Sequence, residues 1–329
     1  MQKLISIIIP NYNGAQTIGN CIEAAFASDY QNFEIVVVDD CSDDDSVSVI
    51  RNYPCKLFEL KQRSGASTAR NTGARESSGD ILFFIDADCL LEKNALSLAA
   101  KSLEENGPGT IIGGTYTELP FDNGFFSTFQ SVFIHYSEVK HLHNPDYVAT
   151  HALIMDAGEF MKSGGFPEEF MPILEDVEYS HRMRRGGYRL LMQPDILVRH
   201  VFNFSLGKSL RNAIRKSLYW TAYSLKNKDL FHDSGTASVE LKANVFSCAL
   251  GIILLLLSFA LQDAAYLFVL VLVVIVNMYV SRNLFAAFFR NMGFSSCLLA
   301  IVYYSSLYAF AVGLGVSAGF MKYFSGDTT

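Results

Sequence analysis

The stretch after Asn244 carries almost no charge, and this limits what the chain can fold into. Its charged residues are Asp263, Arg282, Arg290, Lys322 and Asp327. Two uncharged runs, 245–261 and 264–280, are slightly shorter than the length of about 20 residues that a membrane-spanning helix needs, and a third, 294–320, is longer. A buried helical hairpin in a soluble protein is the alternative interpretation. Three such runs in succession favour a membrane region over residues 245–329.

The distribution of basic residues predicts how this region is oriented. Only two residues separate the first two runs, so these runs are expected to form a tight hairpin. Basic residues precede the first run, and Arg282 and Arg290 follow the second. Because loops rich in Lys and Arg stay in the cytosol, the N-terminal part and segment 281–293 are predicted to be cytosolic, in a multi-pass protein of the inner or plasma membrane. The C-terminus is expected on the far side, where Lys322 is an exception.

Two segments before the tail also combine apolar residues with a helical pattern. Residues 206–244 are predicted to form a basic amphipathic juxtamembrane region, because Leu206–Leu230 interleaves Lys and Arg with Leu, Tyr and Trp220. A plain solvated helix fits this pattern equally well. Phe121–Tyr136 carries aromatic residues along one face, which predicts a helix that faces the core. Contact with lipid is the alternative.

The N-terminal part alternates between short apolar runs and helix-like stretches. The strand-like runs are Leu4–Ile9, Glu34–Val38, Lys56–Leu60 and Ile81–Ile85, and the helix-like stretches are Ala15–Ser28, Asp44–Asn52, Ala66–Ser77 and Glu92–Asn106. This rhythm predicts an α/β domain with a doubly wound sheet, which we place at residues 1–205. The first run ends too soon, at Pro10, to be a signal peptide.

Composition excludes some classes of function. The net charge of −7 argues against general nucleic-acid binding, which needs a basic footprint. The six cysteines form no Cys-x-x-Cys pair. They are expected to be reduced thiols of a cytosolic domain rather than disulfides or zinc ligands.

Asp86-Ala87-Asp88 directly follows the apolar run Ile81–Ile85. In a doubly wound sheet, ligands bind outside the carboxyl ends of the strands. Two carboxylates at such an end suit a hard divalent cation, Mg²⁺ or Mn²⁺, which prefers oxygen ligands. Such a cation can bridge the phosphates of a nucleotide. Taken alone, the pattern fits equally a helix cap at the end of a strand.

Polar residues also follow the other strands of the predicted sheet. Pro10 and Tyr12 end the first strand, and Asp39 ends the second. An aromatic ring can stack on a nucleobase and a carboxylate can accept a base N–H, so these positions predict a nucleoside pocket. Arg70, at the start of a predicted helix, is a candidate contact for a diphosphate, with a surface arginine as the alternative.

Three later features are candidates with weaker local signals. Gly164-Gly165 permits a close backbone approach. Glu175-Asp176 opens a helical stretch, where a carboxylate either complements the helix dipole or serves as a general base. His200 ends an apolar run and is either a third metal ligand or a structural histidine.

Taken in order, these motifs resemble the inverting glycosyltransferases of family 2, which have the GT-A fold. The matching motifs begin at Ser6, Val36, Ala69, Asp86, Gly164 and Glu175, and the resemblance covers roughly residues 1–230. It implies a GT-A Rossmann-like mixed sheet followed by transmembrane helices. It also implies that Asp176 is the catalytic base with Glu175 beside it, and that Asp86, Asp88 and His200 hold Mg²⁺ or Mn²⁺.

The same resemblance implies the ligands. Pro10, Tyr12 and Asp39 would line the nucleobase site, Arg70 and Asp86 would lie near the nucleotide, and the two glycines, Gly164 and Gly165, near the donor sugar. The donor is then a nucleotide-diphosphate sugar, with a UDP-sugar favoured because an aspartate suits uridine.

Membrane attachment predicts a lipid or lipid-linked glycan as acceptor, in cell-envelope, glycolipid or polysaccharide synthesis.

Two departures from the family pattern matter. Cys41-Ser42-Asp43-Asp44 replaces the common Gly-Ser-Thr-Asp, and the Q-x-x-R-W motif of processive members is absent around Trp220, which predicts a non-processive enzyme. A nucleotidyltransferase of similar fold and a non-catalytic membrane scaffold are the alternatives.

Overall fold

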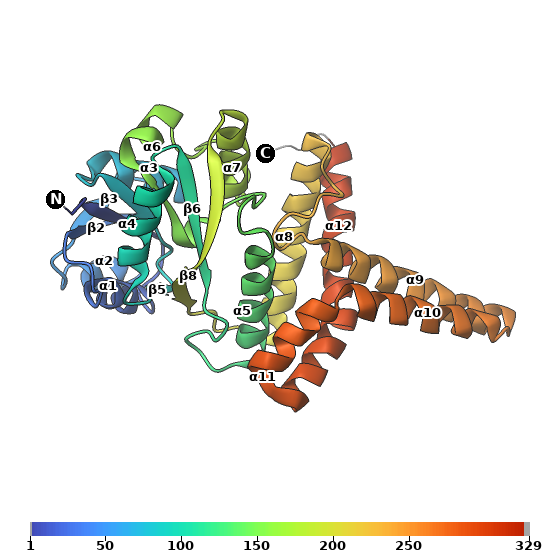
Figure 1. Cartoon of the computed structure of the whole chain (residues 1–329). Coiled ribbons are helices and arrows are strands. Elements are labelled where there is room, and N and C mark those ends of the chain that lie inside the picture. The colour runs from blue at the N-terminus through green and yellow to red at the C-terminus, as the bar shows by residue number, and fades with distance from the viewer. Residues whose placement is uncertain (1, 326–329) are drawn as a thin grey trace. The chain divides into compact units, whose positions relative to one another are not determined.

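The computed structural model describes residues 2–325, which form two compact units (Figure 1). Met1–Asp122 and Glu138–Phe202 make up the first, which we call the sheet unit. Asn123–Ser137 and Asn203–Thr329 make up the second, the helical unit. The helix predicted over 121–136 is observed at Phe125–Glu138 and groups, except for its last residue, with the C-terminal helices, whereas the predicted first domain spans 1–205.

The sheet unit is built on one mixed sheet of eight strands in the order β3-β2-β1-β4-β7-β6-β8-β5. The strands are β1 (Ile5–Asn11), β2 (Phe33–Asp39), β3 (Lys56–Glu59), β4 (Ile81–Phe84), β5 (Cys89–Leu91), β6 (Thr110–Tyr116), β7 (Leu153–Asp156) and β8 (Arg189–His200). The first four strands pair in parallel, as βαβ connections require. β7 joins the sheet antiparallel to β4 and β6, and β5 is antiparallel to β8. The predicted doubly wound mixed sheet is confirmed.

The helices of the sheet unit follow the predicted order. They are α1 (Ile18–Phe26), α2 (Ser46–Ile50), α3 (Ala66–Glu76), α4 (Ala95–Asn106), α6 (Ala157–Ser163) and α7 (Glu175–Arg185). The fourth begins three residues later than predicted, because the chain leaves β5 at Leu91 and residues 93–94 form a turn before the helix starts at Ala95.

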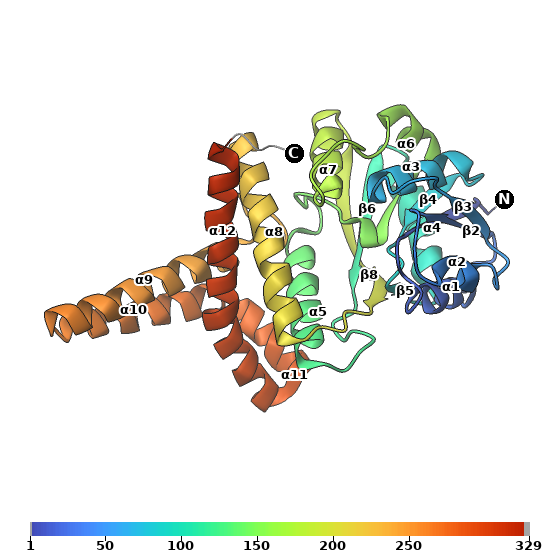
Figure 2. The same ribbon diagram turned by 180° about the vertical axis from the view of Figure 1, so that it is seen from behind.

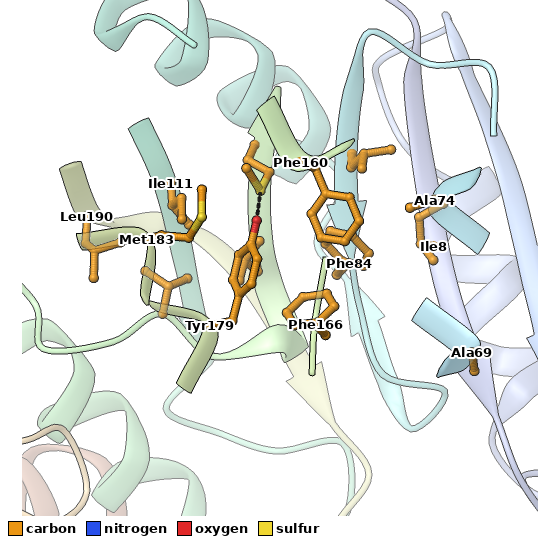
Figure 3. Close-up of a cluster of buried hydrophobic side chains, with 14 of the residues drawn as sticks. Ile8, Ala69, Ala74, Phe84, Ile111, Phe160, Phe166, Tyr179, Met183 and Leu190 are labelled. Carbon is orange, nitrogen blue, oxygen red and sulfur yellow. Dashed lines mark hydrogen bonds between the residues drawn. The ribbon is translucent and has the colours of Figure 1, made fainter. Parts of the chain in front are cut away.

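An aromatic cluster packs α6 and α7 against the sheet (Figure 3). Phe166 and Phe160 both contact Phe84 of β4, with ring centroids 5.1 and 5.0 Å away. Tyr179 of α7 lies against Phe166 and donates its hydroxyl to Met155 Sδ at 3.0 Å. Because Tyr179 is fully buried, it fixes α7, whose first turn carries Glu175 and Asp176.

The helical unit consists of α5 (Phe125–Glu138), α8 (Leu206–Asn227), α9 (Val239–Leu261), α10 (Ala265–Val280), α11 (Arg282–Tyr303), a π-helical turn (Tyr304–Tyr308) and α12 (Ala309–Phe324). The last residue of α5, Glu138, groups with the sheet unit. α9 and α10 lie side by side as the expected hairpin and extend away from the other helices of this unit (Figure 2). Among the described residues, two helical stretches, Val239–Leu261 and Arg282–Phe324, are long and apolar enough to cross a membrane, and α10 is a shorter apolar helix. Only 17% of the apolar window of α9 is buried, which is unlike a core helix.

The segment 281–293, predicted as a loop, is helical instead. α11 begins at Arg282, and the helical pattern of Leu284, Phe285 and Phe288 buries one face of it. The helix breaks only at Gly293, whose φ of 71° suits glycine. The apolar spacing of this segment was hidden because Arg282 and Arg290 gave it the charge of a loop.

α12 packs closely against α8 through two glycines. A Cβ at Gly315 would lie 2.4 Å from the carbonyl oxygen of Ile214, and one at Gly319 would lie 2.6 Å from that of Leu218. Small residues four positions apart let helix backbones approach in this way.

Replacing Gly315 and Gly319 together by Ala is expected to destabilise the helical unit, by about 1–3 kcal/mol as for other overpacked sites. The added methyl groups would clash with backbone carbonyl oxygens of α8, and this clash should outweigh the higher helix propensity of Ala. Thermal unfolding of the full chain in detergent measures the change. Gly313→Ala is the matched control, because its Cβ would lie 3.6 Å from the nearest atom. Equal melting temperatures for the double variant and the control would contradict the proposed close packing.

Candidate active site

A cavity of about 510 Å³ lies in the sheet unit, where β1, β2 and β4 end. Six of the predicted site residues line it: Pro10, Tyr12, Arg70, Asp86, Asp88 and His200. The strand order brings them together, because β1 lies between β2 and β4 and the carboxyl ends of these parallel strands share one edge. The predicted location of the site is therefore where the structure has its polar cavity.

Asp39 is buried beside this cavity but does not line it. Its carboxylate accepts hydrogen bonds from Asn11 Nδ2 at 2.7 Å and from the hydroxyl and backbone N–H of Ser42. Asp40 lines the cavity and holds the backbone N–H groups of Ser64 and Gly65. The first aspartate thus organises the loop after β2, and the second, which the sequence had not singled out, faces the cavity.

Tyr12 and Asn11 present a partly exposed aromatic ring and a buried acceptor at the cavity. The Tyr12 ring is 39% exposed, and the guanidinium of Arg63 lies 4.0 Å from its centroid. Asn11 Oδ1 is buried and has no hydrogen-bond partner among the described residues. A buried acceptor without a partner is costly, so a donor group of a ligand would satisfy it.

Arg70 connects the cavity to the start of α7. Its side chain is 4% exposed, and it donates to Asp86 Oδ1 and to Glu175 Oε1, each at 2.7 Å. The surface-arginine alternative is therefore wrong. Burial opposes ionisation of Asp86, but Arg70 outweighs it and lowers the pKa of this carboxyl. The Arg70 guanidinium is therefore shared by the carboxylates of Asp86 and Glu175.

Replacing Arg70 by Met should destabilise the sheet unit by about 3–5 kcal/mol, because it leaves two carboxylates without their buried partner. Arg70→Lys is expected to recover only part of this, since one ammonium group cannot donate in a fork to both acids. Chemical denaturation followed by circular dichroism provides the measurement. Arg75→Met on the same helix is the control, because Arg75 is half exposed and pairs with Glu168 only at 3.9 Å. A wild-type midpoint for Arg70→Met would refute the role.

Asp88 and His200 form the part of the site that fits a divalent cation. Asp88 Oδ2 and His200 Nε2 are 3.5 Å apart, and these groups together with the Cys89 thiol lie within 4.8 Å of one another. Burial raises the pKa of the Cys89 thiol well above its usual value, so this sulfur is a poor ligand for a hard cation. Asp86, predicted as a ligand, lies outside that group and pairs with Arg70 instead.

Strand pairing explains how His200 reaches this position. β5 and β8 are antiparallel, with Cys89 opposite His200, and Val201 donates its N–H to the carbonyl of Asp88 at 2.8 Å. The end of β8 therefore lies beside the acidic loop that follows β4.

Asp176 lies beside Glu175 in the first turn of α7 and is half-buried. Burial and the adjacent charge of Glu175 raise the pKa of Asp176 to about 6. A carboxyl with such a pKa accepts a proton more readily near neutral pH than an ordinary aspartate does. Neither Glu175 nor Asp176 lines the cavity, so Arg70 is their connection to it.

Gly164 and Gly165 shape a loop away from the cavity lining. Both have positive φ values, 81° and 74°, and a Cβ at Gly165 would lie 2.4 Å from Asn71 Oδ1. Asn71 holds the next residue, Phe166, through its backbone N–H and carbonyl. Close backbone approach, predicted from the glycine pair, occurs here between α3 and the loop.

His151 and Glu138 form a buried pair that the sequence did not reveal. His151 Nε2 is 3.4 Å from Glu138 Oε2, and the Tyr116 ring stacks on His151 with centroids 4.0 Å apart. The Tyr116 ring also forms a T-shaped contact with the His200 ring, with centroids 5.1 Å apart. Burial opposes the charge of His151, but Glu138 outweighs it and raises the pKa of His151. No local motif marks either residue, because Glu138 ends a helix whose other residues looked merely amphipathic.

Part of the chain matches a known protein family. Residues 6–156 match the family model described as glycosyl transferase family 2. The chain is 27% identical over 131 residues to glycosyltransferase GlyG of Streptococcus pneumoniae, covering 38% of this chain and 44% of that protein. It is 27% identical over 209 residues to glycosyltransferase AglE of Haloferax volcanii, covering 60% of this chain and 66% of that protein. The chain thus spans less than two thirds of these relatives.

A solved structure shares the fold over nearly the whole chain. The mannosyltransferase PcManGT of Pyrobaculum calidifontis, in complex with GDP-Man and Mn²⁺, has a TM-score of 0.58 and 17% identity. The likeness covers 98% of this chain and 88% of that one. It confirms the predicted GT-A fold. Glu175, Asp176 and His200 lie beyond the segment that the family model matches.

Proposed function

We propose that this chain, whose residues 6–156 match the family model described as glycosyl transferase family 2, transfers a sugar from a nucleotide diphosphate to a lipid or lipid-linked glycan. The observation that carries this proposal is the row of paired charges from the cavity to α7. Asp86 pairs with Arg70, Arg70 pairs with Glu175, and Glu175 adjoins Asp176. Asp86, at one end of this row, would lie beside the bound nucleotide. Asp176, at the other end, would act as the base.

Asp88 and His200 would hold Mg²⁺ or Mn²⁺, with Asp86 close by. A divalent cation bound there supplies positive charge that stabilises the departing diphosphate. Tyr12 would stack on the base, and Asn11 and Asp40 would accept its N–H groups. A UDP-sugar remains the favoured donor. The mannosyltransferase of similar fold was solved with GDP-Man, which makes a GDP-sugar the first competitor to test.

The reaction would be a direct displacement with inversion at the anomeric carbon. Asp176 takes the proton of the acceptor hydroxyl, and the hydroxyl oxygen forms a bond to the anomeric carbon. The bond from that carbon to the phosphate oxygen breaks, and the nucleoside diphosphate leaves with both electrons. A lipid phosphate as acceptor is already anionic, so Asp176 would then orient it rather than deprotonate it.

The exposed apolar surface of α9 and the adjoining hairpin support attachment to a membrane. With basic residues before α9, the sheet unit would lie on the cytosolic side of an inner or plasma membrane, in a multi-pass protein. A membrane concentrates a lipid-linked acceptor near the enzyme. We place the reaction in cell-envelope, glycolipid or polysaccharide synthesis, with single additions rather than processive ones.

A panel of UDP-, GDP- and dTDP-sugars tests the proposal on the full chain in detergent with Mn²⁺. The correct donor at 100 times its dissociation constant should stabilise the fold by about 2.7 kcal/mol, visible as a thermal shift. It should also release nucleoside diphosphate when a lipid extract is added. Release of pyrophosphate would indicate a nucleotidyltransferase instead. Absence of any nucleotide binding would favour a scaffold.

A further inference from the structure

The helical unit holds a second cavity of about 360 Å³ that the proposed chemistry does not use. It is lined by residues of α5, α8, α9, the π-helical turn, α12 and the connection between α8 and α9. Phe133, Trp220, Tyr308 and Val312 form its buried wall. Its lining is overwhelmingly apolar, which suits a hydrocarbon and disfavours a sugar.

The charged residues of this lining are all of one sign. Lys216 of α8 and Lys242 of α9 are present, and the lining residues that the structure describes include no Asp or Glu. Two aromatic residues of the lining, Phe231 and Phe246, are 85% and 68% exposed. An apolar cavity with exposed aromatic residues and two cations complements an amphiphile that has an anionic head.

The size of the cavity limits the occupant further. Pockets of about 300–1,000 Å³ accommodate drug-sized ligands, so this one takes a segment of a single chain rather than a whole two-chain lipid. We propose that it binds the hydrocarbon chain of a polyprenyl phosphate, whose phosphate is held by Lys216 and Lys242. The inference rests on the proposed function for the acceptor class and gives that acceptor a location on the helical unit.

Photo-crosslinking tests the inference without any sugar donor. The full chain in phosphatidylcholine nanodiscs is irradiated with a polyprenyl phosphate that carries a diazirine in its chain, and labelled peptides are mapped by mass spectrometry. Labels are expected in α8 and α12. Val316→Trp, which fills the cavity, should lower labelling at least fivefold, whereas Val274→Trp on the exposed surface of α10 should not. Ala237→Trp fills the cavity from the connecting segment and should repeat the loss if Val316→Trp misfolds.

The headgroup is tested by competition and by charge removal. Unlabelled polyprenyl phosphate should suppress labelling, and neutral polyprenol should do so at least tenfold less effectively. The double variant Lys216→Gln, Lys242→Gln should lose this preference. Equal competition by phosphatidylglycerol would overturn the assignment in favour of a bulk phospholipid, and unchanged labelling in both Trp variants would overturn the site. Sugar transfer to a water-soluble acceptor without lipid labelling would refute this inference alone. Specific labelling without any sugar transfer would refute only the proposed function.

Discussion

Replacing Asp88 by Asn is expected to lower kcat for sugar transfer by on the order of 100- to 1,000-fold, the effect of removing one group that stabilises the leaving charge. Chelation of divalent cations by EDTA should lower wild-type activity at least as much, and added Mn²⁺ should restore it. The reason is that Asp88 and His200 are the donors in the cavity that suit such a cation. Release of nucleoside diphosphate measures both effects.

Asp43→Asn is the matched control for Asp88, because Asp43 is exposed and does not line the cavity. The Asp88 variant should keep the wild-type melting temperature without ligand, since its side chain is 43% exposed. It should also lose the extra stability that Mn²⁺ and nucleotide confer on the wild type. Full activity of Asp88→Asn, or of the EDTA-treated wild type, would exclude metal dependence.

Asp176→Asn is expected to lower kcat by about 100- to 10,000-fold with a hydroxyl acceptor, because a general base contributes this much. Stability should not fall. The pKa of Asp176 is raised to about 6 in the folded state, so ionisation at neutral pH costs stability, and a neutral Asn removes that cost. Loss of activity together with an equal or higher melting temperature would therefore separate a catalytic role from a structural one.

The pH dependence supplies a second measurement for Asp176. Wild-type kcat/KM should decline as the pH falls through about 6, because the base becomes protonated. Glu169→Gln, at an exposed position shortly before α7, should keep the wild-type profile. With a lipid phosphate as acceptor, the loss in Asp176→Asn should shrink below tenfold. Wild-type activity of Asp176→Asn on a hydroxyl acceptor would rule out the assignment.

The parallel half of the sheet and the cavity position could be predicted from sequence because their signals are local. Ile81–Phe84 is a continuous apolar run, and the carboxylates of Asp86 and Asp88 follow it within four residues. The other half of the sheet, β7-β6-β8-β5, was not predictable in the same way. β5 has three residues, and β6 contains a glycine pair, so neither shows the length or alternation of an ordinary strand.

The partners of the site residues depend on long-range packing, which no local pattern encodes. Arg70 precedes Glu175 by 105 positions, and His151 meets Glu138 only because Thr150–Ala152 precedes β7 in the sheet unit. Asp39 and Asp40 were indistinguishable by sequence. The parallel register that pairs Asn11 with Asp39 decides which of them turns to the loop and which to the cavity.

Arg70 has a consequence for the order of events in the reaction. Its single positive charge is shared by Asp86, which lines the cavity of the candidate site, and by Glu175, which adjoins the proposed base Asp176. Any cation that approaches Asp86 competes with Arg70 for that carboxylate and so changes how strongly Arg70 interacts with Glu175 and, next to it, Asp176. By thermodynamic reciprocity, proton affinity at Asp176 and donor affinity at the cavity must then depend on each other. Binding of the donor would then change the fraction of Asp176 that is ionised, and ionisation of Asp176 would change the affinity for the donor by the same factor.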